Sequence, residues 1–118
     1  MKNPGPKQRR PAPRGPKPPR YLSKEAKTWW ATINQEWDLD DASLLVLEAT
    51  LQALDRWKQA KATLDREGLT VLDRFGQPKP HPCTLVERDS RAAVIRGLKQ
   101  LGLDLEPLNP GPGRPPGK

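Results

Sequence analysis

The side chains best suited to chemistry lie in two small clusters, and the first of them is a histidine and a cysteine. His81 and Cys83 are separated by one proline, and imidazole and thiolate groups are both common zinc ligands. The chain contains 1 histidine and 1 cysteine, so this pair cannot fill a tetrahedral metal site. We therefore expect no metal and no other cofactor, and we expect His81 to form hydrogen bonds that hold the turn before a helix.

The second cluster is acidic and consists of Asp38, Asp40 and Asp41. A nuclease that uses two metal ions needs such carboxylates, but it also needs further acidic groups brought in by the fold. A turn followed by the first residues of a helix explains the same aspartates. The sequence also lacks a glycine-rich phosphate loop and a nucleophile with a plausible base. We therefore expect no enzymatic activity.

The strongest chemical signal is the distribution of charge. The formal net charge is +7, and residues 1–22 carry seven basic side chains and no acidic ones. Seven prolines within residues 1–20 prevent a stable helix, so we expect a disordered basic arm that contacts nucleic acid. A tail that only keeps the protein in solution is the alternative, and a membrane contact is less well supported because the arm has no large apolar side chain.

The residues expected to bind nucleic acid are the cations of this arm and two lysines at the start of the next segment. Charge on a flexible arm positions a nucleic acid without reading its bases, so the two lysines are the better candidates for specific contacts, together with the basic side of the last predicted helix. The candidates are Lys2, Lys7, Arg9, Arg10, Arg14, Lys17, Arg20, Lys24 and Lys27.

The element that positions the rest of the chain is a long helix predicted over residues 40–67, which contain no glycine or proline. Asp40 is the expected N-cap and Gly68 the expected stop. One apolar stripe consists of Leu44, Leu47, Leu51 and Leu54. A second stripe consists of Val46, Ala49, Ala53, Trp57, Ala60 and Leu64. Two stripes need partners on two sides. We expect the second stripe to form the oligomer interface, and burial by the rest of the same chain is the alternative.

The other elements are shorter. A first helix is predicted from Ser23 to about Trp37, where Ala26, Trp30, Ile33 and Trp37 recur at helical spacing. Trp29 and Trp30 are adjacent, so one of them is expected at a boundary or an interface. After the long helix we expect at most a short strand or hairpin that turns at Gly76. A third helix is predicted over about residues 84–100, with Thr84 and Glu87 as a capping box. Its expected buried face consists of Leu85, Ala92, Ile95 and Leu98, joined by Val94 and Leu101, and Gly97 either weakens it or permits a close approach.

These elements predict an all-α fold, a helical hairpin or crossed pair built on the long helix plus a third helix. We expect a disordered arm over residues 1–20, a helical domain over residues 21–105, and a disordered proline- and glycine-rich tail over residues 106–118. Three leucines near the tail are expected to dock onto an assembly or a partner: Leu103, Leu105 and Leu108. Because the domain is small, association into a homo-oligomer is a reasonable supplement to its core.

The order of motifs resembles the small terminase subunit of tailed bacteriophages over roughly residues 18–105. The matching residues are Pro18, Pro19 and Leu22 before the first helix, Asp41, Trp57, Gly68 and Leu69 along and after the long helix, and Gly76, Pro78, Pro80, His81 and Pro82 after that. The end of the chain, DLEPLNPGPGRPPGK, departs from the family pattern.

This resemblance implies a ring-forming homo-oligomer that recognises phage double-stranded DNA and hands it to the large terminase subunit, which holds the ATPase and nuclease. It implies a protein of the host cytoplasm, and the single cysteine and the lack of a signal peptide or membrane span in the sequence agree with that expectation. The alternative is a small helical adaptor protein whose basic arm binds RNA or an acidic protein partner.

Overall fold

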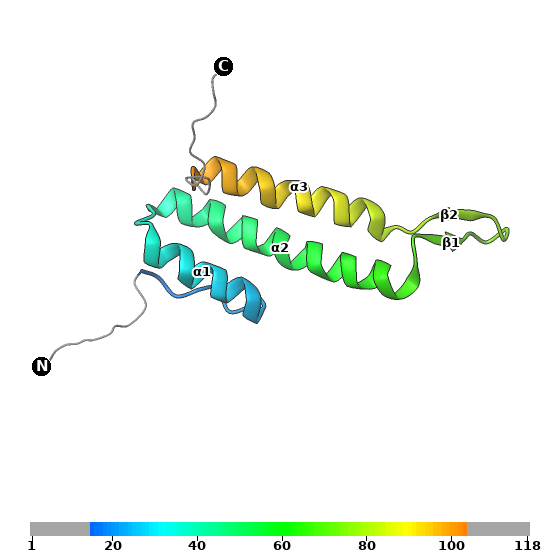
Figure 1. Ribbon diagram of the computed structural model, residues 1–118, viewed down its shortest axis with the longest axis horizontal. Coiled ribbons are helices and arrows are strands. Elements are labelled where there is room, and N and C mark those ends of the chain that lie inside the picture. The colour runs from blue at the N-terminus through cyan, green and yellow to red at the C-terminus, as the bar shows by residue number, and fades with distance from the viewer. Residues whose placement is uncertain (1–14, 104–118) are drawn as a thin grey trace, which may run out of the picture.

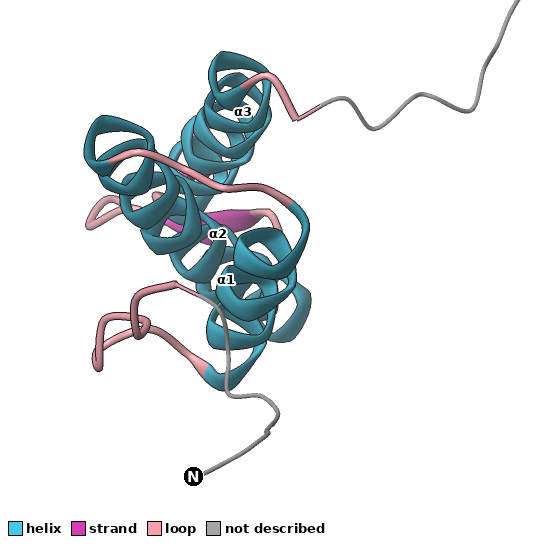
Figure 2. Ribbon diagram, turned by 90° about the vertical axis from the view of Figure 1, so that its left-hand side faces the viewer, coloured by secondary structure: helices cyan, strands magenta, loops and turns pink. Residues whose placement is uncertain are grey.

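The computed structural model describes residues 15–103, which form three helices and two short strands. The elements are α1 (Lys24–Glu36), α2 (Asp41–Glu67), β1 (Thr70–Leu72), β2 (Pro78–Pro80) and α3 (Cys83–Leu101). Helices α2 and α3 run antiparallel side by side, α1 folds back along the first half of α2, and the strands project beyond the far end of the helical pair (Figure 1). Seen nearly along the helix axes, α2 lies between α1 and α3 (Figure 2). The three predicted helices are confirmed, and the hairpin expected after the long helix forms a two-stranded sheet.

The start of α1 is fixed both locally and by α2. Ser23 accepts a hydrogen bond from the Ala26 amide at 3.0 Å, which is the predicted N-cap. The Ser23 amide in turn donates to the Asp55 carboxylate of α2 at 2.8 Å. The same residue therefore begins the first helix and joins it to the second.

Helix α2 begins and ends where the sequence predicts. The Asp40 carboxylate accepts from the Ser43 amide at 2.8 Å, and this bond lowers the pKa of Asp40 from its ordinary value. At the other end Gly68 has a φ of 90°, a conformation that side chains other than glycine rarely adopt, and its amide donates to the Leu64 carbonyl. Both boundaries are confirmed.

The core lies where the three helices meet. Leu47, Leu51 and Leu54 of the first α2 stripe are buried against Trp30 and Ile33 of α1 and against Val94 of α3. Leu44 of the same stripe is partly buried at the edge of this cluster. The first stripe is therefore the core face of α2.

The start of α3 differs from the prediction. The helix begins at Cys83, its N-cap position is Pro82, and no side chain caps it. Thr84 lies inside the helix and donates to the His81 carbonyl at 2.6 Å. Glu87 makes its contacts with other residues, described below, so the predicted capping box is wrong.

The buried face of α3 also differs from the prediction. Ser90, Val94 and Gly97 are buried, and Leu98 and Leu101 pack partly against the core. In contrast, Leu85 is 55 % exposed and Ile95 is 59 % exposed, so their assignment to the core is wrong. Small residues occupy the buried face of α3 because they allow its backbone to lie close to α2. A Cβ atom added to Gly97 would lie 1.9 Å from the Thr50 Oγ1 atom.

The two strands form an antiparallel hairpin that turns at Gly76, as predicted. Val71 pairs with Lys79, and the prolines at 78 and 80 pair with the two ends of β1. Within the turn the Asp73 carboxylate accepts from the amides of Phe75 and Gln77 at 2.8 and 2.9 Å. Gly76 has a φ of 78°. No helix within residues 15–103 is long and apolar enough to cross a membrane.

Candidate nucleic-acid and assembly surfaces

The proline-rich segment before α1 packs against that helix. The Trp30 indole N–H donates to the Pro16 carbonyl at 2.8 Å, and Leu22 is buried in the core. Gly15 lies so close to Asn34 that a Cβ atom there would be 3.3 Å from the Asn34 Oδ1 atom. Part of the segment over residues 15–20, which the sequence assigned to the arm, therefore packs against α1.

The candidate nucleic-acid ligands divide between this packed region and the arm. Lys17 and Arg20 lie exposed on the packed segment, and Lys24 and Lys27 lie in the first turns of the helix that it covers, with Lys27 half-buried. The fold therefore places two of these cations on α1 and the other two on the segment that packs against α1. The other candidates lie outside the described residues: Lys2, Lys7, Arg9, Arg10 and Arg14.

The second stripe of α2, predicted as a contact between subunits, meets α3 of its own chain along much of its length. Ala60 is buried, and Ala53 and Trp57 pack against the core. The Trp57 indole N–H donates to the Glu87 carboxylate of α3 at 3.0 Å. Val46 and Leu64 are half-buried and Ala49 is exposed. The structure therefore gives Ala53, Trp57 and Ala60 a partner within the protomer.

Glu87 links two elements through its charge. Its carboxylate accepts from Arg91 at 3.0 Å, and this bond, together with that from Trp57, lowers the pKa of Glu87 from its ordinary value. The Glu87 carboxylate therefore helps to join α3 to α2, through its hydrogen bond from Trp57. It has no capping role.

The leucines predicted to dock onto a partner are also divided. Leu103 is buried in the core of its own chain, where it joins the cluster between α1 and α3. This is a correction for Leu103, because a side chain buried in the protomer is not available to another protein. Leu105 and Leu108 lie outside the described residues.

His81 connects the end of α2, the hairpin and the start of α3. Its Nε2 atom lies 2.9 Å from Glu67 Oε1, and its Nδ1 atom accepts from the Cys83 amide at 2.9 Å. The bond to His81 lowers the pKa of Glu67, and the His81 amide donates to the Leu69 carbonyl. Both ring nitrogens are therefore used in hydrogen bonds, which confirms the predicted role at this turn. Within residues 15–103 no three His, Cys, Asp or Glu side chains gather as a metal site.

An apolar groove between the helices was not predicted from the sequence. It has a volume of about 430 Å³ and is lined by residues of α1, α2 and α3, among them Trp29, Trp37, Trp57 and Leu98. Trp29 is 48 % exposed. The sequence signal for this groove is the pair of adjacent tryptophans at 29 and 30, because two neighbouring residues on a helix cannot both face the same core. Periodicity alone could not show that three tryptophans from two helices share one surface.

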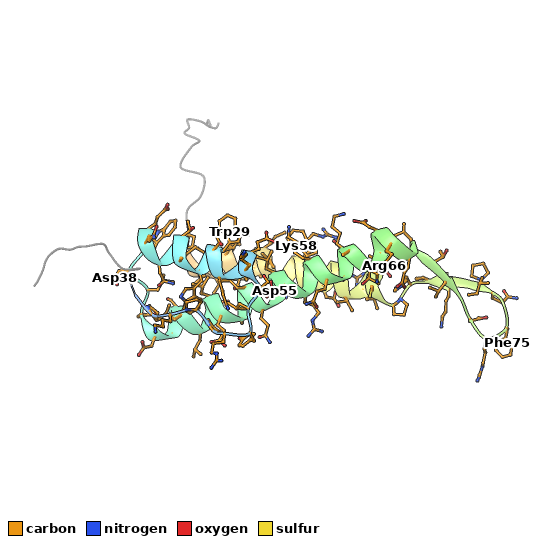
Figure 3. The ribbon with its side chains drawn as sticks, turned by 90° about the horizontal axis from the view of Figure 1, so that it is seen from below. Trp29, Asp38, Asp55, Lys58, Arg66 and Phe75 are labelled. Carbon is orange, nitrogen blue, oxygen red and sulfur yellow. The ribbon has the colours of Figure 1, made fainter. Side chains whose placement is uncertain are left out.

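A second apolar surface lies on the hairpin. Phe75 at its tip is 76 % exposed, and Leu69 and Leu72 are exposed as well. Figure 3 shows Phe75 at the end of the molecule remote from Trp29. The sequence predicted the turn but assigned no role to these side chains.

Comparison with known proteins identifies the family. The family model for the phage terminase small subunit matches residues 25–106 of the 118-residue chain. Comparisons with curated proteins and with solved structures gave no match. The matched region runs from the second residue of α1 past the end of α3 and includes the hairpin, and it is well over half of the chain. The chain therefore belongs to the family of phage terminase small subunits, whose role lies in phage DNA packaging.

Proposed function

We propose that this protein recognises phage genomic DNA and delivers it to the large terminase subunit, whose activity it regulates. In this proposal it acts as a ring-type homo-oligomer in the host cytoplasm and has no catalytic activity of its own. The single observation that carries the proposal, beside the family match, is the concentration of positive charge in residues 1–22. From Ser23 to Gly102, twelve basic residues are balanced by twelve acidic ones.

The arm supplies affinity through phosphate contacts. Each phosphate that a cationic side chain neutralises contributes about −0.9 to the slope of log affinity against log salt on duplex DNA. In an oligomer several arms act on one DNA molecule, so the second and later contacts form at a high effective concentration. Weak individual arms can therefore hold DNA firmly at low salt.

Specific recognition requires ordered side chains, because base contacts need fixed geometry. Lys24 and Lys27 on α1, flanked by Lys17 and Arg20 on the packed segment, meet this requirement. We place sequence-specific contacts there and the salt-dependent affinity in residues 1–14.

The test replaces five arm cations with glutamine in the full-length chain: Lys2, Lys7, Arg9, Arg10 and Arg14. Substitution is better than deletion of residues 1–20, because that deletion would also remove the Pro16 carbonyl that accepts from Trp30. We expect weaker binding to all duplex sequences, and a salt slope reduced by up to about 4.5 for each arm whose five residues all contact phosphate. Fluorescence anisotropy with labelled duplex DNA over a range of salt concentrations measures both quantities.

A control removes charge from the body, and the change in slope is compared per charge removed. Three exposed cations of α2 are replaced with glutamine, because the basic side of α3 is itself a candidate for DNA contacts: Arg56, Lys61 and Arg66. The proposal predicts a much smaller change in slope per charge for this variant. Equal changes per charge in the two variants would show that net charge alone attracts the DNA and that the arm has no special role.

A further inference from the structure

We propose that the hairpin tip of one subunit inserts into the tryptophan-lined groove of a neighbouring copy of the same chain. Phe75 is the inserting side chain, and the groove is the one lined by Trp29, Trp37 and Trp57. The inference rests on the proposed homo-oligomer and adds the contact that would build it. It assigns roles to two of the apolar surfaces that stay exposed on the described part of the chain.

The two surfaces cannot meet within one chain. Trp57 is the groove tryptophan on α2, and ten residues of helix separate it from Glu67. At 1.5 Å per residue this is about 15 Å, and the hairpin then continues away from the groove. Figures 1 and 3 show the hairpin projecting beyond the helices. Only a second molecule can bring a hairpin to this groove.

The hairpin is already ordered for such a contact. The Asp73 carboxylate holds the turn through the amides of Phe75 and Gln77, and the His81 amide ties the base of the hairpin to Leu69. A tip that is fixed before binding loses little conformational entropy on insertion. An exposed aromatic side chain on a rigid turn therefore makes an efficient anchor.

The charges around the two surfaces are complementary. Asp73, Arg74 and Lys79 lie in the hairpin, and their charges sum to +1 because the Asp73 carboxylate stays ionised while it accepts from its own turn. The groove carries the carboxylates of Glu25 and Glu36 on the α1 side, and Lys58 faces Glu25 at 3.7 Å. A basic tip with an aromatic anchor thus meets an apolar groove with an acidic edge. The acidic residues Asp104 and Glu106, which flank Leu105 in the tail, suit this edge less well.

The contact would be heterologous, because it joins two different surfaces of the same molecule. Each subunit then offers one hairpin and one groove, and repetition of the contact continues until a ring closes. Two such contacts per subunit also cover most of the large exposed aromatic side chains on the described part of the chain.

The test uses two full-length variants, Phe75→Asp and Trp29→Glu, studied separately and mixed. Both residues are exposed, so neither change disturbs the core, and helix content by circular dichroism checks this. Both replacements are acidic so that the altered surfaces do not attract each other. By size-exclusion chromatography with light scattering, each variant alone should behave as a single chain. An equimolar mixture should form two-chain species and nothing larger, because one intact hairpin and one intact groove remain.

Ile95→Glu is the matched control, since Ile95 is exposed on α3 outside both surfaces, and this variant should keep the wild-type size. The proposal is overturned if either Phe75→Asp or Trp29→Glu keeps the wild-type size, if the mixture forms no pairs, or if Ile95→Glu dissociates as they do. Dissociation by Leu105→Glu with Leu108→Glu would assign the groove to the tail and also overturn it. DNA binding is measured on the same samples, because the arm is intact in all of them. Loss of assembly with retained salt-dependent binding separates this contact from the proposed function.

Discussion

The closest contact between α2 and α3 gives a sharp prediction for Gly97→Ala. A Cβ atom at position 97 would lie 1.9 Å from Thr50 Oγ1, 2.9 Å from Thr50 Cβ and 3.0 Å from Thr50 Cγ2. Rotation of the threonine side chain moves its outer atoms but not its Cβ, so the helices must separate. Overpacking of this kind costs about 3 kcal/mol at the upper end of its usual range. Alanine recovers about 1 kcal/mol through its helix propensity.

We therefore expect Gly97→Ala to lower the free energy of unfolding by about 2 kcal/mol, which corresponds to a fall in melting temperature of roughly 10 °C for a domain of this size. In a Thr50→Ala background two of the three clashing atoms are absent, so the same change should cost less than about 1 kcal/mol. Urea denaturation of the four proteins of this double-mutant cycle, all at one protein concentration, measures the coupling.

A matched pair at an exposed site, Arg88→Gly and Arg88→Ala, measures helix propensity without the clash. The reasoning fails if Gly97→Ala stabilises the protein by the amount that separates this pair. It fails as well if the Thr50→Ala background leaves the cost unchanged.

Two further predictions concern His81 and the carboxylates of Asp40 and Glu67. Replacing His81 with alanine leaves the partly buried Cys83 amide without its acceptor and should cost about 1–3 kcal/mol, with faster amide exchange in the hairpin. His81→Asn keeps an acceptor near the Nδ1 position and should cost less. The pKa values of Asp40 and Glu67 are lowered in the folded state. The stability that their ionised carboxylates add is therefore fully present above the ordinary pKa values of 3.8 and 4.5, and it is lost as the pH falls through the lower pKa values of the folded state. Urea midpoints should therefore decline below about pH 4.5, and Glu67→Gln should flatten the upper part of that decline; an unchanged profile would contradict the role of the carboxylate.

The sequence by itself determined the features that depend on neighbouring residues. The N-caps at Ser23 and Asp40, the stop at Gly68 and the turn at Gly76 are all formed by side chains or backbone conformations within a few residues of the groups that they satisfy. The imbalance of charge in the arm is likewise a property of composition. The order of these local signals was also enough to suggest the family.

Only the tertiary structure decided which apolar faces are buried, because burial depends on elements far apart in the chain. Leu85 and Ile95 are as apolar as Val94, but the closest approach of α3 to α2 runs along Ser90 and Gly97 and turns the larger side chains outward. Ala60, on the second stripe of α2, is buried as well. Trp30 draws the proline segment onto α1 through the Pro16 carbonyl, a bond across fourteen residues that no local pattern encodes. The groove exists because helix packing leaves Trp29 at the edge of the core, and its form follows from the placement of three helices.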